Sequence, residues 1–211
     1  MKHFLISFFA AAVSLLFGGV NEVNGDPLTY EVSGDTVSII DCKTSATGDL
    51  VIPSTYAGKS VTTIGNFAFS DCSSLTSVTI PDSVTNMGHG AFGGCSSLTS
   101  VTIPDSITTI GWRVFGGCIC LTSVAIPDSV TSILEDAFQY CRSLTSLTIP
   151  DSVTSIGDFA FSGCSSLTSI EVGKGNTKYT SEDGVLFDKN KTVLIQFPAG
   201  KSGHYTIPDS V

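Results

Sequence analysis

The side chains that could carry chemistry in this chain recur every 23 residues. Five cysteines keep this spacing: Cys72, Cys95, Cys118, Cys141 and Cys164. Four aspartates do the same: Asp82, Asp105, Asp128 and Asp151. Thiols can bind metals or pair as disulfides, and carboxylates can bind calcium, so both series are candidate sites. A fixed period in the twenties is also typical of a solenoid, in which equivalent side chains of successive coils form columns.

Histidine, the commonest general base, is scarce. His89 and His204 are the only histidines beyond His3. His89 occupies a variable position of the repeat, whose equivalents in the other coils are Asn66, Trp112, Glu135 and Asp158. A serine nucleophile needs a base that a third group holds in place, and the repeat singles out no serine with such partners. We therefore expect no enzyme and no catalytic residue.

The cysteines admit two interpretations. Equivalent positions on adjacent coils lie about 5 Å apart with parallel side-chain directions, whereas a disulfide needs Cβ atoms about 3.5–4.5 Å apart that face each other. We therefore predict a column of buried thiols; a metal-binding column is the weaker alternative, because no histidine recurs beside them. Cys120 replaces a serine of the other coils and is predicted to be an exposed, reactive thiol. Cys42 lies outside the repeat, and the sequence does not place it.

The aspartates lie in Pro-Asp-Ser turns. Calcium takes 6–8 oxygen ligands, and one carboxylate per coil supplies too few, so we interpret the aspartates as turn formers and expect no metal and no cofactor. The serine that follows resembles an O-glycan acceptor pattern, Asp-Ser-Val or Asp-Ser-Ile, used by some bacteria, although the repeat alone explains its recurrence. The candidate acceptors are Ser83, Ser106, Ser129 and Ser152.

Each coil begins with Leu-x-x-Val-x-Ile, whose alternation predicts a strand with its apolar side chains inward. The outward side chains then form an array of hydroxyls on the concave face, where solenoids commonly bind ligands. The candidate ligand-binding residues are Ser77, Thr79, Ser100, Thr102, Ser123, Ser146, Thr148 and Ser169. The alternative is that these residue types simply suit exposed strand positions. A second candidate contact is the pair Trp112 and Arg113 on the convex side.

The rest of the coil is predicted from proline, glycine and phenylalanine. Pro-Asp-Ser forms a turn, and a second short extended segment follows it. Gly88 ends that segment and is expected at positive φ, as are its equivalents Gly65, Gly111 and Gly157. Phe67-Ala68-Phe69 and its equivalents are long enough for one helical turn. One phenylalanine per coil is expected to join an internal column: Phe69, Phe92, Phe115, Phe138 and Phe161.

Residues 1–25 have the layout of a secretory signal peptide: Lys2 and His3, then apolar residues from Phe4 to Val20, then a polar stretch. The alternative is a retained anchor, but this stretch is shorter than the roughly 20 residues of a membrane span. We expect cleavage, secretion, and no membrane insertion of the mature chain.

The remaining residues divide into a cap and a solenoid. Residues 26–46 lack the repeat and predict a β-hairpin that caps the first coil. The solenoid is predicted over 47–211, with a longer first coil, four strict coils, and a hairpin-like insertion at about 173–204. The repeat stops in mid-unit at Val211, so we interpret the chain as an incomplete gene product.

Charge argues against one class of partner. The 211 residues include 10 Lys and Arg against 19 Asp and Glu, for a net charge of −9, and the basic residues form no run. Nucleic-acid binding needs a basic surface, so we expect no nucleic-acid partner.

The whole pattern, Leu-x-x-Val-x-Ile-Pro-x-x-Val-x-x-Ile-Gly-x-x-Ala-Phe-x-x-Cys, resembles the BspA-type leucine-rich repeat from Thr47 to Val211. The resemblance implies a secreted or cell-surface protein whose relatives act in adhesion to host matrix proteins or to other cells. It therefore implies a protein or cell-surface ligand as the partner. The alternative is a structural spacer without a ligand of its own, and a third hypothesis is a catalytic or metal-dependent repeat protein.

Overall fold

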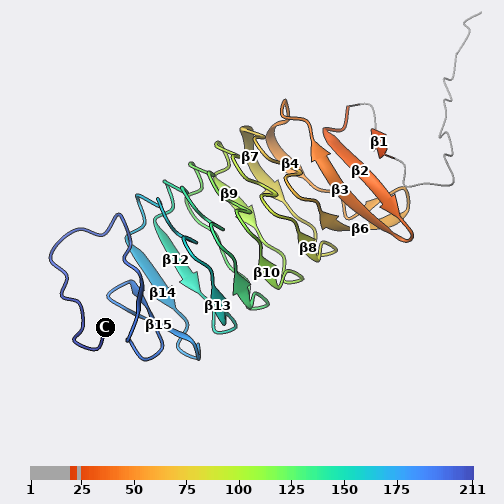
Figure 1. Ribbon diagram of the computed structural model, residues 1–211. Helices are drawn as coiled ribbons and strands as arrows, with labels where there is room; N and C mark the ends of the chain where they lie inside the picture. The colour runs from red at the N-terminus through yellow and green to blue at the C-terminus, as the bar shows by residue number, and fades with distance from the viewer. Residues whose placement is uncertain (1–19, 23–24) are drawn as a thin grey trace, which may run out of the picture.

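The repeats form one elongated stack of coils in the computed structural model, which describes residues 20–22 and 25–211 (Figure 1). The predicted solenoid with parallel ladders is confirmed. Over the described residues the secondary structure consists of strands and turns without a helix, so the single helical turns expected around Phe69 and its equivalents are not found there. Most of the predicted signal peptide, residues 1–25, lies outside the described residues.

A hairpin lies at the N-terminal end of the stack. Strands β2 (Leu28–Ser33) and β3 (Thr36–Cys42) pair antiparallel, and β1 (Val20–Glu22) pairs with β2. Strand β3 also pairs in parallel with β6 (Lys59–Ile64) of the first coil. The predicted hairpin thus occupies the place that a preceding coil would take, while its role as a cap stays a prediction.

The first coil is longer than the others because it contains a small hairpin. Its outer strand is β4 (Thr47–Val51), and β5 (Thr55–Tyr56) pairs antiparallel with β6. Ala57 and Gly58 make the turn between β5 and β6 with φ of 51° and 76°. A two-residue turn with positive φ at both positions matches the twist of a hairpin, which explains the extra residues.

The outer strands form a parallel ladder that is interrupted once. Strand β4 pairs with β7 (Ser74–Thr79), β7 with β9 (Ser100–Thr102), and β12 (Ser146–Ile149) with β14 (Ser169–Val172). The strand predicted in the fourth coil does not form, and a single bridge joins Thr102 to Ala125. No backbone hydrogen bond joins residues 123–126 to residues 146–149 of the next coil.

A second parallel ladder follows the proline turns. It consists of two-residue strands in successive coils: β8 (Asn86–Met87), β10 (Thr109–Ile110), β11 (Ser132–Ile133) and β13 (Ser155–Ile156). Strand β8 pairs with β6, and β10, β11 and β13 pair in sequence with a register of 23 residues, as in Ile110 opposite Ile133. This confirms the predicted second extended segment.

Each coil then passes through a six-residue stretch that we call the turn segment: residues 66–71, 89–94, 112–117, 135–140 and 158–163. The N–H groups of its second, fourth and sixth residues donate to the carbonyls of the first, third and fifth residues of the following segment. For example, Phe69 donates to Ala91 over 2.8 Å and Phe92 to Val114 over 2.9 Å. Three such bonds at each of four junctions make twelve, of 2.7–3.2 Å. They tie the coils together where no strand exists.

The repeat glycines serve a different purpose from the one predicted. Gly65, Gly88, Gly111 and Gly157 do not have positive φ. A Cβ on Gly88 would instead lie 2.5 Å from the backbone nitrogen of Asn66 in the preceding coil, and one on Gly157 would lie 2.4 Å from that of Glu135. At these two positions glycine is needed because two backbones approach closely, a second use of its missing side chain. Leu134 takes the equivalent place in the fourth coil. Positive φ occurs at the second and sixth residues of the turn segments.

The core consists of columns, as predicted. Adjacent rings from Phe69 to Phe161 stack at centroid distances of 4.9–6.0 Å with interplanar angles of 9–17°. The repeat leucines and the five repeat cysteines form parallel columns of fully buried side chains. Every column is continuous along the stack, so each coil is stabilised by apolar burial against its two neighbours.

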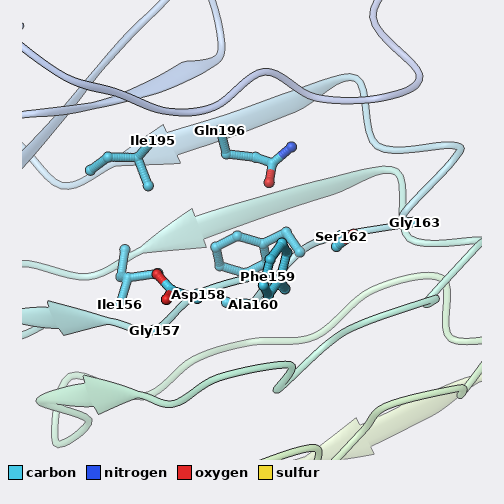
Figure 2. A pocket seen from close by; sticks show the side chains of 10 residues that line it. Ile156, Gly157, Asp158, Phe159, Ala160, Ser162, Gly163, Ile195 and Gln196 are labelled. Atoms are coloured by element: carbon cyan, nitrogen blue, oxygen red, sulfur yellow. The ribbon is translucent and has the colours of Figure 1, made fainter.

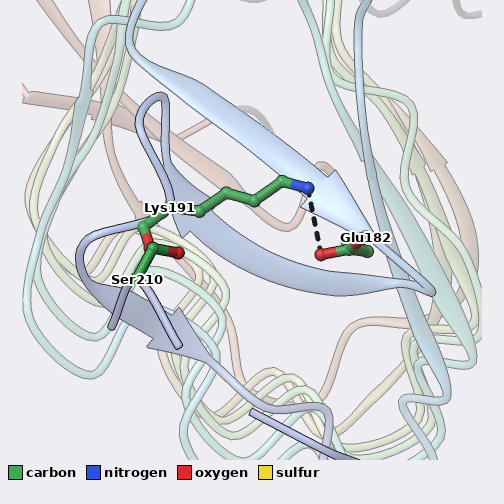
Figure 3. A network of polar contacts seen from close by, with 3 residues as sticks. All are labelled: Glu182, Lys191 and Ser210. Carbon is green, nitrogen blue, oxygen red and sulfur yellow. Dashed lines mark hydrogen bonds and ion pairs between the residues drawn. The ribbon is translucent and has the colours of Figure 1, made fainter. Parts of the chain in front are cut away.

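The C-terminal insertion is a three-stranded antiparallel sheet of β15 (Tyr179–Glu182), β16 (Val185–Asp188) and β17 (Leu194–Gln196). The predicted hairpin corresponds to β16 and β17, and β15 was not predicted. The insertion lies against the sixth coil, where Ile170 N–H donates to the Gly184 carbonyl over 2.8 Å. Lys191 forms an ion pair of 3.0 Å with Glu182 across it (Figure 3).

Candidate binding surface

The outward side chains of the outer strands form the surface that we call the hydroxyl row. It contains Ser77, Thr79, Ser100, Thr102, Ser123, Ser146, Thr148 and Ser169. All are exposed except Ser77 and Ser169, which are half-buried, whereas the alternate residues Val78, Val101 and Leu147 are buried. The orientation predicted from alternation is therefore confirmed, and the row repeats once per coil along the stack.

Carboxylates lie at both ends of the hydroxyl row. At the N-terminal end, Ser77 and Thr76 donate hydrogen bonds of 2.7 and 2.9 Å to Oδ1 of Asp49. Both bonds lower the pKa of Asp49, and the bond from Ser77 contributes more than the bond from Thr76. This group therefore stays ionised at neutral pH. At the other end, Ser169 donates to Glu171 over 2.6 Å. The row thus offers neutral hydroxyls between two anionic ends.

A shallow depression interrupts the row at the fourth coil. It has a volume of about 380 Å³ and is lined by residues 123–126 and 146–148. It coincides with the missing outer strand and with Ala125, which replaces the threonine of neighbouring coils. The substitution was visible in the sequence, but the loss of ladder hydrogen bonds around it was not.

The predicted contact pair belongs to a larger aromatic cluster. The Arg113 guanidinium carbon lies 5.4 Å from the centre of the half-buried Trp112 ring. Phe67 and His89, from the two preceding coils, meet Trp112 edge-on at centroid distances of 6.3 and 6.2 Å. Phe67 was not predicted as part of this cluster. Its ring lies against Gly90, where a Cβ would be only 2.5 Å from it, so the glycine of the next coil makes room for the ring.

The cysteines are all free thiols, and six of the seven are buried. The thiols of the column donate to the backbone of the preceding coil, as in Cys118 to the Phe92 carbonyl over 3.2 Å. Burial raises the pKa of Cys95 to about 12 and that of Cys164 to about 11, so these thiols are poor nucleophiles. The predicted thiol column is confirmed. Cys120 is exposed, as predicted, and its reactivity stays a prediction.

Cys42, which the sequence could not place, lies at the base of the same column. The Cys72 thiol donates to its carbonyl over 3.6 Å. A hydrogen bond with Cys72, together with burial, raises the pKa of the Cys42 thiol. The column therefore continues from the coils into the N-terminal hairpin.

The turn serines have a structural role. Ser129 donates to the Ile107 carbonyl and Ser152 to the Val130 carbonyl, each over 2.7 Å, and Ser106 makes the equivalent bond. Ser83 donates to Ser54 over 3.3 Å. These bonds link adjacent coils and explain why serine recurs; glycosylation of the same hydroxyls stays a prediction.

Within residues 20–22 and 25–211, no three His, Cys, Asp or Glu side chains group as metal ligands. The same part of the chain contains no helix that is long and apolar enough to cross a membrane.

Comparison with known proteins gives a consistent result. The family model "BspA type Leucine rich repeat region (6 copies)" matches residues 49–168 and 85–200. A solved T. pallidum leucine-rich repeat protein is 31% identical with a TM-score of 0.65, over 71% of either chain. The pneumococcal vaccine antigen PcpA is 25% identical with a TM-score of 0.70, over 92% of this chain and 60% of that one.

A leucine-rich cell surface protein from Faecalibacterium prausnitzii is 27% identical with a TM-score of 0.54. The match covers 90% of this chain and 65% of that protein. No curated protein matches the sequence.

Proposed function

Because the chain belongs to the BspA-type leucine-rich repeat family, we propose that it is a secreted or cell-surface module that binds a protein or cell-surface ligand in adhesion. The observation that carries the proposal is the hydroxyl row, which is exposed and repeats at every coil. The description of the Faecalibacterium neighbour as a cell surface protein supports the location.

The row favours many weak contacts over one strong contact. Each hydroxyl can donate one hydrogen bond and accept others, so it can pair with peptide or sugar groups. The row lacks the aromatic and arginine side chains that dominate interface energetics. Binding strength would come from several coils acting on one ligand or from several molecules on one cell surface, where weak contacts combine.

A pull-down with matrix proteins and with whole cells tests the proposal. We expect saturable binding that is lost when Thr79, Thr102 and Thr148 are replaced together by alanine. The matched control replaces three exposed threonines elsewhere in the coils, Thr85, Thr108 and Thr131, and should leave binding unchanged. Equal loss in both triple variants would contradict a specific role for the row.

A structural spacer is the competing function. It is favoured by the same lack of aromatic and arginine anchors in the row. A spacer would show no saturable binding to any matrix protein or cell tested, and the threonine substitutions would have nothing to change. The pull-down therefore separates the two functions.

We also propose a second contact at Trp112 and Arg113, now together with Phe67, whose side chain is 53% exposed. Trp112→Ala should weaken a saturable interaction if the aromatic cluster contacts the ligand. Tyr140→Ala, which removes an exposed aromatic ring from another turn segment, is the matched control. Unchanged binding in Trp112→Ala would restrict the contact to the hydroxyl row.

A further inference from the structure

The buried thiol column has a different arrangement at its N-terminal end. In four coils the column thiol donates to a phenylalanine carbonyl of the preceding coil over 3.0–3.2 Å: Cys95, Cys118, Cys141 and Cys164. Cys72 belongs to the first coil, where the N-terminal hairpin takes the place of a preceding coil. Its thiol donates instead to the carbonyls of Cys42 and Lys43 over 3.6 and 3.8 Å.

The thiols of Cys42 and Cys72 converge on one atom. The Cys42 thiol donates over 3.7 Å to the Lys43 carbonyl oxygen, the same oxygen that accepts from Cys72. The two cysteines are only 3% and 0% exposed. A hydrogen bond between the two thiols is the main cause that raises the pKa of Cys42 and lowers the pKa of Cys72. Their sulfur atoms therefore lie next to each other in the core.

The two cysteines reach the column by different paths. Cys72 lies eight residues after Ile64, the last residue of β6, and a turn segment connects them. Ile39 of β3 is the partner of Ile64, and Cys42 lies only three residues after Ile39. The repeat cysteines share one path, so their side chains are parallel and their Cβ atoms do not face each other as a disulfide requires. This restriction does not apply between Cys42 and Cys72, which come from unlike elements.

The opposite end of the column lacks such a pair. Cys164 is the last member, and the C-terminal insertion contributes Ile195 and Gln196, which face residues 158–163 across a pocket of about 380 Å³ (Figure 2). None of the residues that line this pocket is a cysteine. Among residues 20–22 and 25–211, Cys42 and Cys72 are thus the one pair of neighbouring column thiols that belong to unlike elements.

We propose that Cys42 and Cys72 form a disulfide under oxidising conditions, which fastens the N-terminal hairpin to the first coil while the other four column thiols stay free. The oxidant is an external small disulfide such as oxidised glutathione. One protein thiolate attacks this disulfide and displaces a first small thiol, and the other protein thiolate then attacks the mixed disulfide and displaces a second. The two protein thiols lose two electrons and two protons, which leave with the two small thiols.

The exchange takes place before the hairpin has docked on the first coil. Both sulfur atoms are buried in the folded protein, whereas a thiol must be accessible to react with an external disulfide. The chemistry therefore belongs to folding in an oxidising compartment, where disulfides form and persist.

The disulfide would hold the hairpin on an edge of the solenoid. It closes a loop of about 30 residues that contains β4, β5 and β6, and such a link stabilises a fold chiefly because it restricts the unfolded chain. Strand β3 covers the edge of β6, and an uncovered edge could pair with other chains. This inference goes beyond the proposed adhesion, and its test on purified protein does not depend on secretion.

Refolding in a redox buffer tests the proposal. Purified protein with Cys120→Ser, which removes the exposed thiol, is unfolded in urea with a reductant and refolded in a mixture of oxidised and reduced glutathione. Free thiols are alkylated in urea, and peptides from a digest without reduction are identified by mass spectrometry. We expect Cys42 linked to Cys72 in most molecules. Cys95 and Cys118, an equally buried adjacent pair, are the internal control and should be alkylated.

Amide hydrogen exchange measures the consequence of the link. In β3 and β6 exchange should be at least tenfold slower in the oxidised protein than after reduction, whereas exchange in β12 and β14 should not change. Cys42→Ala should abolish this redox difference, and Cys118→Ala, which removes a buried thiol from another coil, should keep it. Each variant is compared with itself before and after reduction, so a general loss of stability does not affect the result.

Four outcomes would overturn the proposal. The refolded protein has no link between Cys42 and Cys72, or links among the other column cysteines are as frequent. Alternatively, the link forms but leaves exchange in β3 and β6 unchanged, or the protein regains its folded circular dichroism spectrum only in the presence of a reductant.

Discussion

At the scale of single residues, Gly88, which ends the second short strand of its coil, allows two coils to approach closely because it has no side chain. A Cβ on Gly88 would lie 2.5 Å from the Asn66 backbone nitrogen and 2.6 Å from the Gly65 carbonyl carbon. Because these are backbone atoms, the coils would have to separate.

We therefore expect Gly88→Ala to lower the free energy of unfolding by about 3 kcal/mol, the upper part of the usual cost of overpacking. Urea unfolding, monitored by circular dichroism, measures this change in the free energy of unfolding. Gly34→Ala is the control: Gly34 has φ of 56° but open space around it, so strain alone should cost about 1 kcal/mol. Equal losses would show that close approach is not the constraint at Gly88.

The buried thiols predict a loss of stability in alkali. Burial raises the pKa of Cys95 to about 12 and that of Cys164 to about 11, from an ordinary value of 9.0. Above pH 9 the unfolded chain releases these protons while the folded chain keeps them, so stability falls as pH rises from about 9 towards 12.

We expect the urea midpoint to decrease from pH 8 to pH 10. In Cys95→Ala the decrease should be smaller, because one raised pKa is removed, even though the cavity lowers stability at every pH. A decrease of the same size in the variant and the parent protein would assign the pH dependence to other groups.

Residue types predicted the columns well and the backbone poorly. Phe115 and Cys118 could be placed from period alone, because a column needs only a fixed spacing and an inward direction. The positive φ of Phe67, Arg113 and Phe159 could not, because these residue types give no sign of it. The contact between Phe67 and Trp112 also spans two coils, and alignment of the repeats does not reveal it.

At the scale of elements, one buried amide joins the solenoid to the C-terminal insertion. Asn176 is 1% exposed, and its Nδ2 donates to the carbonyls of Pro150 and Val153 over 2.8 and 2.9 Å. Its Oδ1 accepts from the N–H groups of Lys178 and Tyr179. It satisfies four backbone groups, two in the proline turn of the fifth coil and two at the start of β15.

Asn176→Ala should therefore lower the free energy of unfolding by about 3 kcal/mol, because buried groups lose their partners. Hydrogen exchange measured by mass spectrometry should show that the amides of β15 and β16 lose protection first. Asn190→Ala, at an exposed position of the same insertion, should change stability by less than about 0.5 kcal/mol. A global change in exchange without local opening at β15 would contradict this role.

Elements were predicted where the local pattern was sufficient. The hairpins at β2–β3 and β16–β17 follow from alternating residues around a turn, and both were found. The fourth coil has the same strand pattern as its neighbours but forms only the bridge at Ala125. Strand formation there depends on hydrogen bonds to both adjacent coils, which a local pattern does not contain.

At the scale of the whole molecule, stability resides in contacts between neighbouring coils. The same turn-segment bonds recur at each of four junctions, and every core column crosses all of them. It should therefore be possible to delete one whole repeat and keep the columns of the remaining coils aligned. Deleting residues 98–120, a full period, should leave a folded protein with a cooperative but less stable urea transition.

Deleting residues 98–117 instead removes 20 residues and shifts every column. This variant should lose the folded circular dichroism spectrum or aggregate in size-exclusion chromatography. Comparable stability of the two deletions would refute the dependence on register. The period alone predicted this architecture, whereas strand β15 was not predicted, because the insertion interrupts the repeat and has no equivalent in the other coils.

The coil-by-coil arrangement of contacts also determines how the molecule would respond to pulling. A coil peeled from one end breaks contacts with a single neighbour and leaves the others in place. Each detached coil of 23 residues would release roughly 80 Å of chain at about 3.3–3.6 Å per residue. Under tension between two surfaces, the molecule would lengthen in steps and dissipate work at each one, as a mechanical tether does.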